Sequence, residues 1–426
     1  MTYHVDSKEA KKSKGRFGAI LVCWFLGIGS LIAWNSMLTI VDYYVKVFPR
    51  YHPTRVLSVV YQPFALVTIA ILAYHEAKLN TRIRNLFGFS LFFLSSLLVI
   101  VLDLATSGKG GVGTFIGVCL ISAAFGVADA HVQGGMVGDL AVMQPEFMQS
   151  FLAGLAASGA LTSALRLITK AAFEHSHDGL RKGAMLFFAV ASFLELLGLK
   201  TVSADLAAAG VQVQDKQKVC FSLSLFSSFL PLFISSLLFA NFRSQYMHLS
   251  QAEEDPNQLE RLTLRQLLIQ NWDYALDLFL IYVLTLSIFP GFLSEDTGKH
   301  ALGSWYALIL ITMYNATDLI GRYSPLIPWL RIESRRALMI IILLRFFLIP
   351  AFYFTAKYGA QGYMIMLTSL LGITNGHLTV CVLTEAPKGH KGPEANALGN
   401  LLVAFLLGGI CSGVALDWLW LIGKGW

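Results

Sequence analysis

The residues best suited to bind a polar solute lie in one short stretch, MYNATDLIGRYSP, at residues 313–325. Within it, Asn315, Asp318 and Arg322 fall at i, i+3 and i+7, so at about 100° per residue they share one face of a helix. An acid and a base at i and i+4 can bridge each other, which lowers the cost of burying both charges. Two interpretations stay open: a structural ion pair, or a clamp for vicinal hydroxyls in which the carboxylate accepts hydrogen bonds and the guanidinium donates them.

Side chains suited to a flat heterocycle lie in two other apolar stretches. Trp34 lies midway along residues 17–41, with Leu38 one turn later. Gln133 follows Asp129 by four residues on one helix face, where its amide can present hydrogen bonds to the edge of a ring. For Trp34, stacking on a base and ordinary helix packing are both open, because a lone tryptophan in a membrane helix often serves packing alone.

The remaining polar residues inside apolar stretches divide into two groups. An ionisable side chain at mid-bilayer costs about 3 kcal/mol on insertion scales, so each needs a partner, a cavity or a function. Candidates for proton coupling or for an internal polar network are Asp129, His131, Glu195 and His377. Arg166 and Arg345 are assigned a structural role.

No sequence signature of an enzyme accompanies these residues. The five cysteines lie mostly inside apolar runs without CxxC or Cys/His spacing, which favours packing over metal binding. The chain has no HExxH motif and no GxGD pair. We therefore expect no catalytic residue, no metal and no cofactor.

Composition indicates which elements must position the candidate residues. Of 426 residues, 55% are hydrophobic and only 14% are charged, and the mean hydropathy is +0.62. Apolar runs of about 20 residues, enough for a helix to cross about 30 Å of hydrocarbon, recur along the chain. The sequence therefore predicts an all-α, multi-pass membrane protein, and the net charge of +6 requires no nucleic-acid partner because basic residues collect in loops beside membrane spans.

Eleven spans are expected, six before and five after a long polar region. They are placed at residues 17–41, 56–75, 85–106, 113–138, 149–170, 183–199, 272–293, 304–323, 337–356, 360–383 and 397–422.

This map divides the chain into four parts. Residues 1–16 form a cytoplasmic tail, residues 17–199 an N-terminal helical half, residues 200–271 an inter-half loop, and residues 272–426 a C-terminal helical half. The loop contains an extra apolar segment at 219–242. With eleven spans and the N-terminus inside, most basic loop residues of the second half also fall inside, whereas a twelfth crossing would invert that half.

Several short motifs resemble those of the equilibrative nucleoside transporters and occur in the same order as in that family. The sequence as a whole is most similar to the plant branch of the family. The motifs are Trp34-Asn35, Gln133-Gly134, SIFPG at 287–291, YNATDLIGR at 314–322, TNGHL at 374–378 and a glycine-rich last span. Pro290 within SIFPG also predicts a kink in the seventh span.

The resemblance implies a major-facilitator-like fold of six plus five helices and nucleoside transport by alternating access, facilitative or coupled to protons. We expect the membrane to be the plasma membrane. It also implies roles for individual residues: Asp318 and Arg322 contact the ribose hydroxyls, Gln133 faces the nucleobase, Trp34 and Leu38 line the pocket, and Asn315 supports the clamp. The expected partners are the nucleoside and the lipid bilayer, with protons as an open alternative.

The sixth span departs from the family pattern, because its apolar run ends near Leu199 and a further apolar segment follows at 219–242. Two alternatives therefore accompany the main interpretation. One is a carrier for another organic solute such as a sugar; the other is a nucleoside-binding variant whose transport is impaired by the altered sixth helix.

Overall fold

A computed structural model describes residues 2–76, 79–173, 178–208, 262–295, 301–358, 360–390 and 392–421. Within these ranges the chain forms helices joined by turns and short 3₁₀ segments, and contains no strand. The α-helices are α1 (Thr2–Thr39), α2 (Val41–Val47), α3 (Pro53–Tyr74), α4 (Thr81–Thr106), α5 (Val112–Ala141), α6 (Pro145–Phe173), α7 (Gly179–Ala208), α10 (Leu264–Gln270), α11 (Trp272–Leu286), α12 (Gly291–Glu295), α13 (Tyr306–Tyr323), α14 (Arg335–Leu344), α15 (Leu348–Tyr358), α16 (Gln361–Glu385) and α17 (Gly392–Asp417).

Ten helical stretches of the described chain are long and apolar enough to cross a bilayer. Three of them join consecutive elements: α11 with the start of α12, α14 with α15, and α17 with the 3₁₀ turn that follows it. The 18-residue α13 lies among these spans but is less apolar, because it carries Asp318 and Arg322. All eleven expected spans therefore fall on helices, and the prediction of an all-α, multi-pass membrane protein is confirmed.

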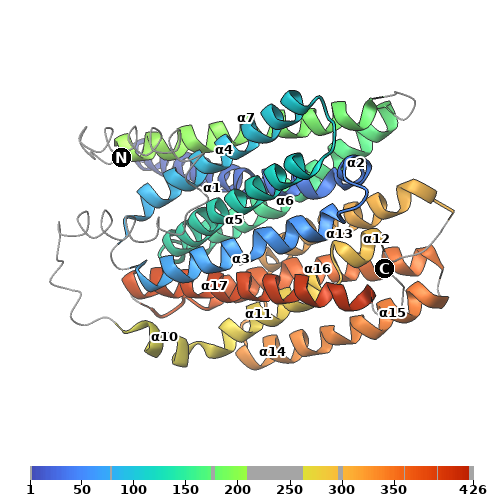
Figure 1. Ribbon diagram of the computed structural model, residues 1–426. Helices are drawn as coiled ribbons and strands as arrows, with labels where there is room; N and C mark the ends of the chain where they lie inside the picture. The colour runs from blue at the N-terminus through green and yellow to red at the C-terminus, as the bar shows by residue number, and fades with distance from the viewer. Residues whose placement is uncertain are drawn as a thin grey trace.

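The helices form two groups, which we call the N-terminal half (α1–α7) and the C-terminal half (α10–α17). Figure 1 shows the blue and green helices of the first group above the yellow to red helices of the second. Within the halves, α1 packs on α6, α3 and α4 pack on α5, α11 packs on α17, and α13 packs on α16. The halves meet along two interfaces, one between α6 and α13 and the other between α17 and the pair α3 and α5.

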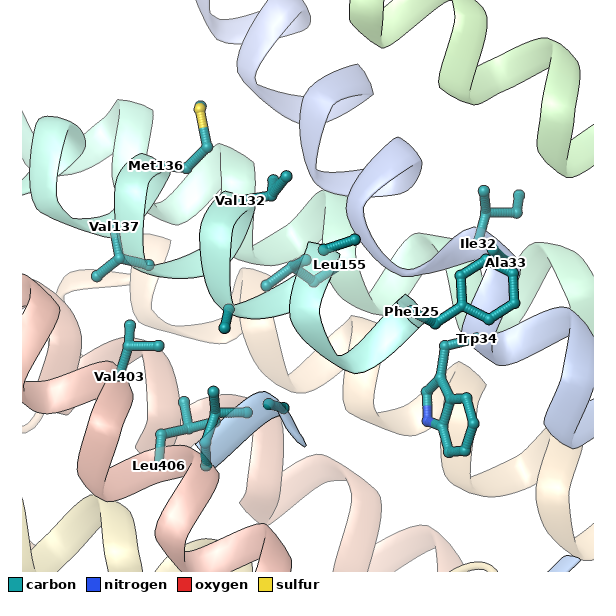
Figure 2. Close-up of a cluster of buried hydrophobic side chains, with 14 of the residues drawn as sticks. Ile32, Ala33, Trp34, Phe125, Val132, Met136, Val137, Leu155, Val403 and Leu406 are labelled. Carbon is teal, nitrogen blue, oxygen red and sulfur yellow. The ribbon is translucent and has the colours of Figure 1, made fainter. Parts of the chain in front are cut away.

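Apolar packing continues from one half into the other. A single cluster of buried side chains contains residues of both halves, and Figure 2 shows Val137 of α5 and Val403 of α17 on neighbouring helices within it. Phe125 and Trp34 lie further along the same cluster. A second cluster, which includes Phe292 and Tyr314, lies inside the C-terminal half.

The sixth span is longer than predicted. α7 continues to Ala208, past the expected end near Leu199, and its membrane-compatible stretch runs from Gly179 to Ser203. Residues 200–208 contain no glycine or proline and include good helix formers, so the helix continues although its polarity rises. The expectation that the loop starts at residue 200 is thus wrong in detail, while the extra segment 219–242 lies outside the described residues.

Two other local features follow from sequence. α10 lies within the expected loop and begins with a capping box, in which Thr263 and Gln266 satisfy each other's backbone N–H groups. The kink predicted at Pro290 is confirmed: α11 ends at Leu286, and after a short turn α12 begins at Gly291.

Candidate functional site

Asp318 and Arg322 form a buried ion pair along one face of α13. Arg322 Nε donates to Asp318 Oδ2 at 3.0 Å, and each side chain is 7% exposed. The other carboxylate oxygen, Oδ1, accepts a hydrogen bond of 2.7 Å from Asn375 Nδ2 of α16. Both oxygens of this carboxylate are therefore bound to donors, as a buried charge requires.

Asn375 reaches Asp318 because α13 and α16 approach closely. A Cβ atom on Gly376 would meet the backbone carbonyl of Asp318, and one on Gly321 would meet the carbonyl of Ile373. Only glycine permits this distance between the two backbones, so these glycines determine where the Asn375 amide lies.

Arg322 also contacts the opposite half. Its Nη1 donates to the backbone carbonyl of Leu152 in α6 at 2.8 Å, and Gln149 Nε2 of α6 donates to the carbonyl of Arg322 at 3.2 Å. The guanidinium thus joins the carboxylate of its own helix to a backbone oxygen of the N-terminal half.

Asn315 lies two turns earlier at the same interface. Its Nδ2 donates to Ser163 Oγ of α6 at 2.8 Å. Gly159 makes room for it, because a Cβ atom there would come within 2.7 Å of Asn315 Oδ1. Of the three predicted residues on this face, Asn315 and Arg322 contact α6 directly, whereas Asp318 turns toward α16.

A chain of hydrogen bonds continues from Asn375 into the C-terminal half. Thr285 Oγ1 of α11 donates to Asn375 Oδ1 at 2.9 Å, and Arg345 Nη2 donates to Thr285 Oγ1 at 3.1 Å. Arg345 Nε also donates to Thr374 Oγ1 at 3.0 Å. Thr285 has no signature in the sequence, because threonine is common in membrane helices and its neighbours form no motif with it. Asn375 lies in the TNGHL motif, which marked this stretch of the chain without giving the residue a role.

The aromatic candidate in the N-terminal half lies in a stack. Trp34 is buried, and its ring lies 4.0 Å from the ring of Tyr61 in α3 at an interplanar angle of 24°. Leu38, one turn later, is half-buried against the core, and Asn35 Nδ2 donates to Ser158 Oγ of α6 at 2.6 Å. Tyr61 is an aromatic partner that the sequence did not reveal, because it comes from another helix.

Gln133 and Asp129 are joined on α5. Gln133 Nε2 donates to Asp129 Oδ1 at 2.6 Å, and both side chains are buried. His131 points to another face, where its ring lies 4.7 Å from that of Phe87 in α4. His131 therefore does not share the helix face of Gln133.

The other polar candidates are spread over the molecule. Glu195 is completely buried within the N-terminal half. His377 is half-buried on α16, and its Nδ1 lies 2.6 Å from Ser324 Oγ, just after α13. Arg166 is buried on α6 and lies against Gly183 of α7. The structure does not bring these three residues together with Asp318.

Polar contacts also join the halves at the end of the bundle where α4 and α17 begin. Arg84 Nη1 of α4 donates to Asn400 Oδ1 of α17 at 2.5 Å, and Asn396 Nδ2 of α17 donates to Asp139 Oδ1 of α5 at 3.2 Å. We call this the inner end, because the predicted cytoplasmic N-terminus lies on the same side (Figure 1).

Two further contacts join the halves at the opposite, outer end. Arg55 at the start of α3 pairs with Asp417 at the end of α17, with Nε and Oδ2 3.2 Å apart. The ammonium of Lys170 on α6 lies 5.0 Å from the centre of the Trp305 ring, which precedes α13. The halves are therefore in contact at both ends in this conformation.

Comparison with known proteins identifies the family of this chain. A family model described as nucleoside transporter matches residues 115–422, which is most of the chain. The chain belongs to the nucleoside transporter family. This confirms the family and the transport function that its motifs predicted.

Within the nucleoside transporter family, relatives in Arabidopsis thaliana are similar over their whole length. Equilibrative nucleotide transporter 3 is 58% identical, covering 100% of this chain and 99% of the relative. Equilibrative nucleotide transporter 6 is 56% identical, covering 98% of each. The similarity to the plant branch is thus also confirmed.

Solved structures show the same fold for this nucleoside transporter family member. A proton:xylose symporter of the major facilitator superfamily, bound to 6-bromo-6-deoxy-D-glucose, superposes with a TM-score of 0.62 at 12% identity, covering 95% of this chain and 88% of the other. A bacterial homologue of the iron transporter ferroportin, in an outward-facing state, gives 0.54 at 15% identity, covering 94% and 91%. The predicted major-facilitator-like fold is confirmed.

Proposed function

We propose that this protein carries nucleosides through one site between its two halves, and that Asp318 and Arg322 bind the ribose. The bond from Arg322 Nη1 to the Leu152 carbonyl supports this proposal most directly. Through this bond, the guanidinium on α13 of the C-terminal half contacts α6 of the N-terminal half, and in the proposed site α13 faces the substrate. A ribose hydroxyl would replace the Leu152 carbonyl as acceptor, while Asp318 would accept a hydrogen bond from the neighbouring hydroxyl.

The other side of the proposed site belongs to the N-terminal half. Gln133 would face the nucleobase, held by its bond to Asp129, and Trp34 and Leu38 would line the pocket. Trp34 already has a flat partner in Tyr61, which supports a stacking role for this indole. Asn315 would hold α13 against α6 beside the sugar.

Transport would proceed by rocking of the two halves around this site. This cycle involves no covalent chemistry and requires no enzymatic activity, cofactor or nucleic-acid partner. The basic residues near its start favour a cytoplasmic N-terminus. The membrane proposed is the plasma membrane.

Uptake by proteoliposomes tests the function. Labelled adenosine should enter in a saturable manner, and unlabelled nucleosides should compete while hexoses should not. Competition by hexoses instead would support a sugar carrier. Saturable binding without uptake would support the transport-impaired alternative.

Ion coupling is decided by the same assay with a pH gradient. Asp129 is the titratable candidate in direct contact with a proposed substrate residue, Gln133, so a proton-coupled cycle would involve it first. Asp129→Asn should then abolish the stimulation of uptake by external acid. Uptake indifferent to both pH and a protonophore would exclude coupling through Asp129, His131, Glu195 or His377.

Gln133→Ala tests recognition of the base. Because Gln133 is proposed to contact the base rather than the sugar, the variant should change the ratio of adenosine to uridine uptake more than it changes the amount of protein in the membrane. An unchanged ratio would remove Gln133 from the site.

A further inference from the structure

The ion pair between Arg55 and Asp417 has the properties of a gate. Arg55 belongs to the first turn of α3 in the N-terminal half, and Asp417 ends α17 in the C-terminal half, 362 residues later. The two side chains are 2% and 6% exposed. We propose that this pair is the outer gate of the transport cycle: it holds the halves together at the outer end and separates whenever the central site opens there.

The inference rests on the proposed alternating access. In that cycle the two halves separate at one end at a time, so a contact that bridges them at the outer end cannot persist through the outward-open state. A buried ion pair with good geometry is a strong link while it is closed, and once hydrated its two charges lose much of their attraction. Such a pair therefore favours two discrete arrangements, closed and open.

Asp417 is positioned by its own half, independently of Arg55. Its Oδ1 accepts a hydrogen bond of 3.0 Å from the backbone N–H of Phe292, at the start of α12. Gly291 packs against the same carboxylate, and a Cβ atom there would collide with it. The break between α11 and α12 thus presents a backbone donor to Asp417, which keeps the carboxylate in place when Arg55 leaves.

Arg55 is the side of the gate that changes partners. Its guanidinium carbon lies 5.8 Å from the centre of the Trp418 ring, so it also has a cation–π contact with the C-terminal half. Thr54, Ser58 and Pro290 line a small pocket beside the pair. The pocket adjoins both charges and is the place where water would first reach them.

Thiol labelling tests the gate without reference to any substrate. Ser58 lies one turn deeper than Arg55 and is buried, so Ser58→Cys places a reporter beneath the pair. In a background whose five native cysteines are replaced, a membrane-impermeant thiol reagent would be applied to each side of oriented vesicles in turn. Reaction from the outer side then measures how often the outer end opens.

Two substitutions should open the gate. Asp417→Asn preserves size and the acceptor for the Phe292 amide but removes the ion pair, and Gly291→Ala displaces the carboxylate. Each should accelerate labelling of the reporter by about tenfold, because the loss of one charge-assisted hydrogen bond shifts the equilibrium between closed and open states by about that factor. Gly362→Ala is the matched control, since it makes the same change on α16 where nothing lies within 4 Å of the new Cβ. Unchanged labelling in both Asp417→Asn and Gly291→Ala would overturn the gate.

Crosslinking supplies the complementary result. Arg55→Cys with Asp417→Cys, joined by a short bis-methanethiosulfonate that forms a disulfide with each thiol, should lower nucleoside uptake at least about tenfold, and a reductant, which cleaves those disulfides, should restore it. Arg335→Cys with Asp273→Cys is the control, because that pair has the same 3.2 Å separation but lies within one half. Full uptake by the crosslinked outer pair would contradict the gate. Absence of uptake by the unsubstituted protein would instead contradict the proposed function, and labelling would still decide the gate.

Discussion

Two buried arginine–aspartate pairs in this protein have nearly the same geometry and different positions. Arg322 and Asp318 are 3.0 Å apart on one helix, whereas Arg55 and Asp417 are 3.2 Å apart on helices of opposite halves. A rigid rocking of the halves preserves the first pair and breaks the second. Position relative to the moving parts, and not the chemistry of the pair, therefore separates a proposed substrate clamp from a proposed gate.

The guanidinium of the first pair also makes a hydrogen bond across the interface. Arg322 donates to the Leu152 carbonyl, and this bond must also be broken when α6 and α13 separate. Because a ribose hydroxyl would compete for the same donor, substrate binding would weaken this contact between the halves. Substrate can shift a conformational equilibrium only through such a difference in affinity between two states.

The largest expected effect comes from breaking the first pair. Arg322→Ala removes the partner of a buried carboxylate and the bond to Leu152, so we expect uptake to fall by about two orders of magnitude, equivalent to about 3 kcal/mol. Arg322→Lys should show most of this loss, because lysine retains the charge but not the forked donors. The measurement is initial uptake per transporter at the membrane surface.

A result with normal uptake in Arg322→Ala and in Asp318→Asn would make the pair structural. Fluorescence-detected gel filtration of each variant provides the control for folding. A variant that elutes as a single peak but does not transport supports the clamp.

A smaller effect is expected at the residue that orients Asp318. Asn375→Ala removes the donor to Oδ1, and the net value of a hydrogen bond to a charged group, about 1.5 kcal/mol at the lower limit, corresponds to about tenfold in apparent affinity. Asn375→Asp should be worse than alanine, because it places two carboxylates together. Competition curves with unlabelled adenosine measure the affinity, and equal affinity in all three proteins would show that Asp318 needs no orientation.

A change of several-fold is expected at the α6–α13 interface. Asn315→Ala and Ser163→Ala each remove the same hydrogen bond, which is worth about 1 kcal/mol, so their effects on uptake should be similar and the double variant should add little. Additive losses in the double-mutant cycle would mean that the two side chains act independently.

The smallest effect concerns the aromatic ring beside the second pair. Trp418→Phe weakens a cation–π contact worth about 0.5–1 kcal/mol, so uptake should change by about twofold to fivefold, less than in Asp417→Asn. A loss equal to that of Asp417→Asn would shift the importance of the outer contact from the ion pair to the ring.

Much of the helical map followed from the sequence because hydrocarbon restricts the chain to helices of a certain length. The eleven apolar stretches lie on helices, and Pro290 interrupts one where its missing N–H requires a break. The end of α7 was placed too early, since the helix continues beyond its apolar part where no residue terminates it. Polarity marks the membrane boundary, whereas glycine, proline and capping residues mark the helix boundary.

The candidate site was predictable only where its contacts are local. The bridge between Asp318 and Arg322 and the one between Gln133 and Asp129 are both i, i+4 contacts, which helix periodicity places together. The partners Asn375, Tyr61 and Leu152 come from other helices, and one of them acts through a backbone carbonyl that no residue type announces.

The sequence by itself determined that this chain spans a membrane, which residues share a helix face, and to which family its motifs belong. The tertiary structure alone decided which polar groups meet between the halves, including the contact of Arg55 with Asp417. The reason is physical: periodicity and hydropathy are properties of consecutive residues, whereas a contact across an interface depends on how closely glycine-lined helices approach and on which side chains then fill the space between them.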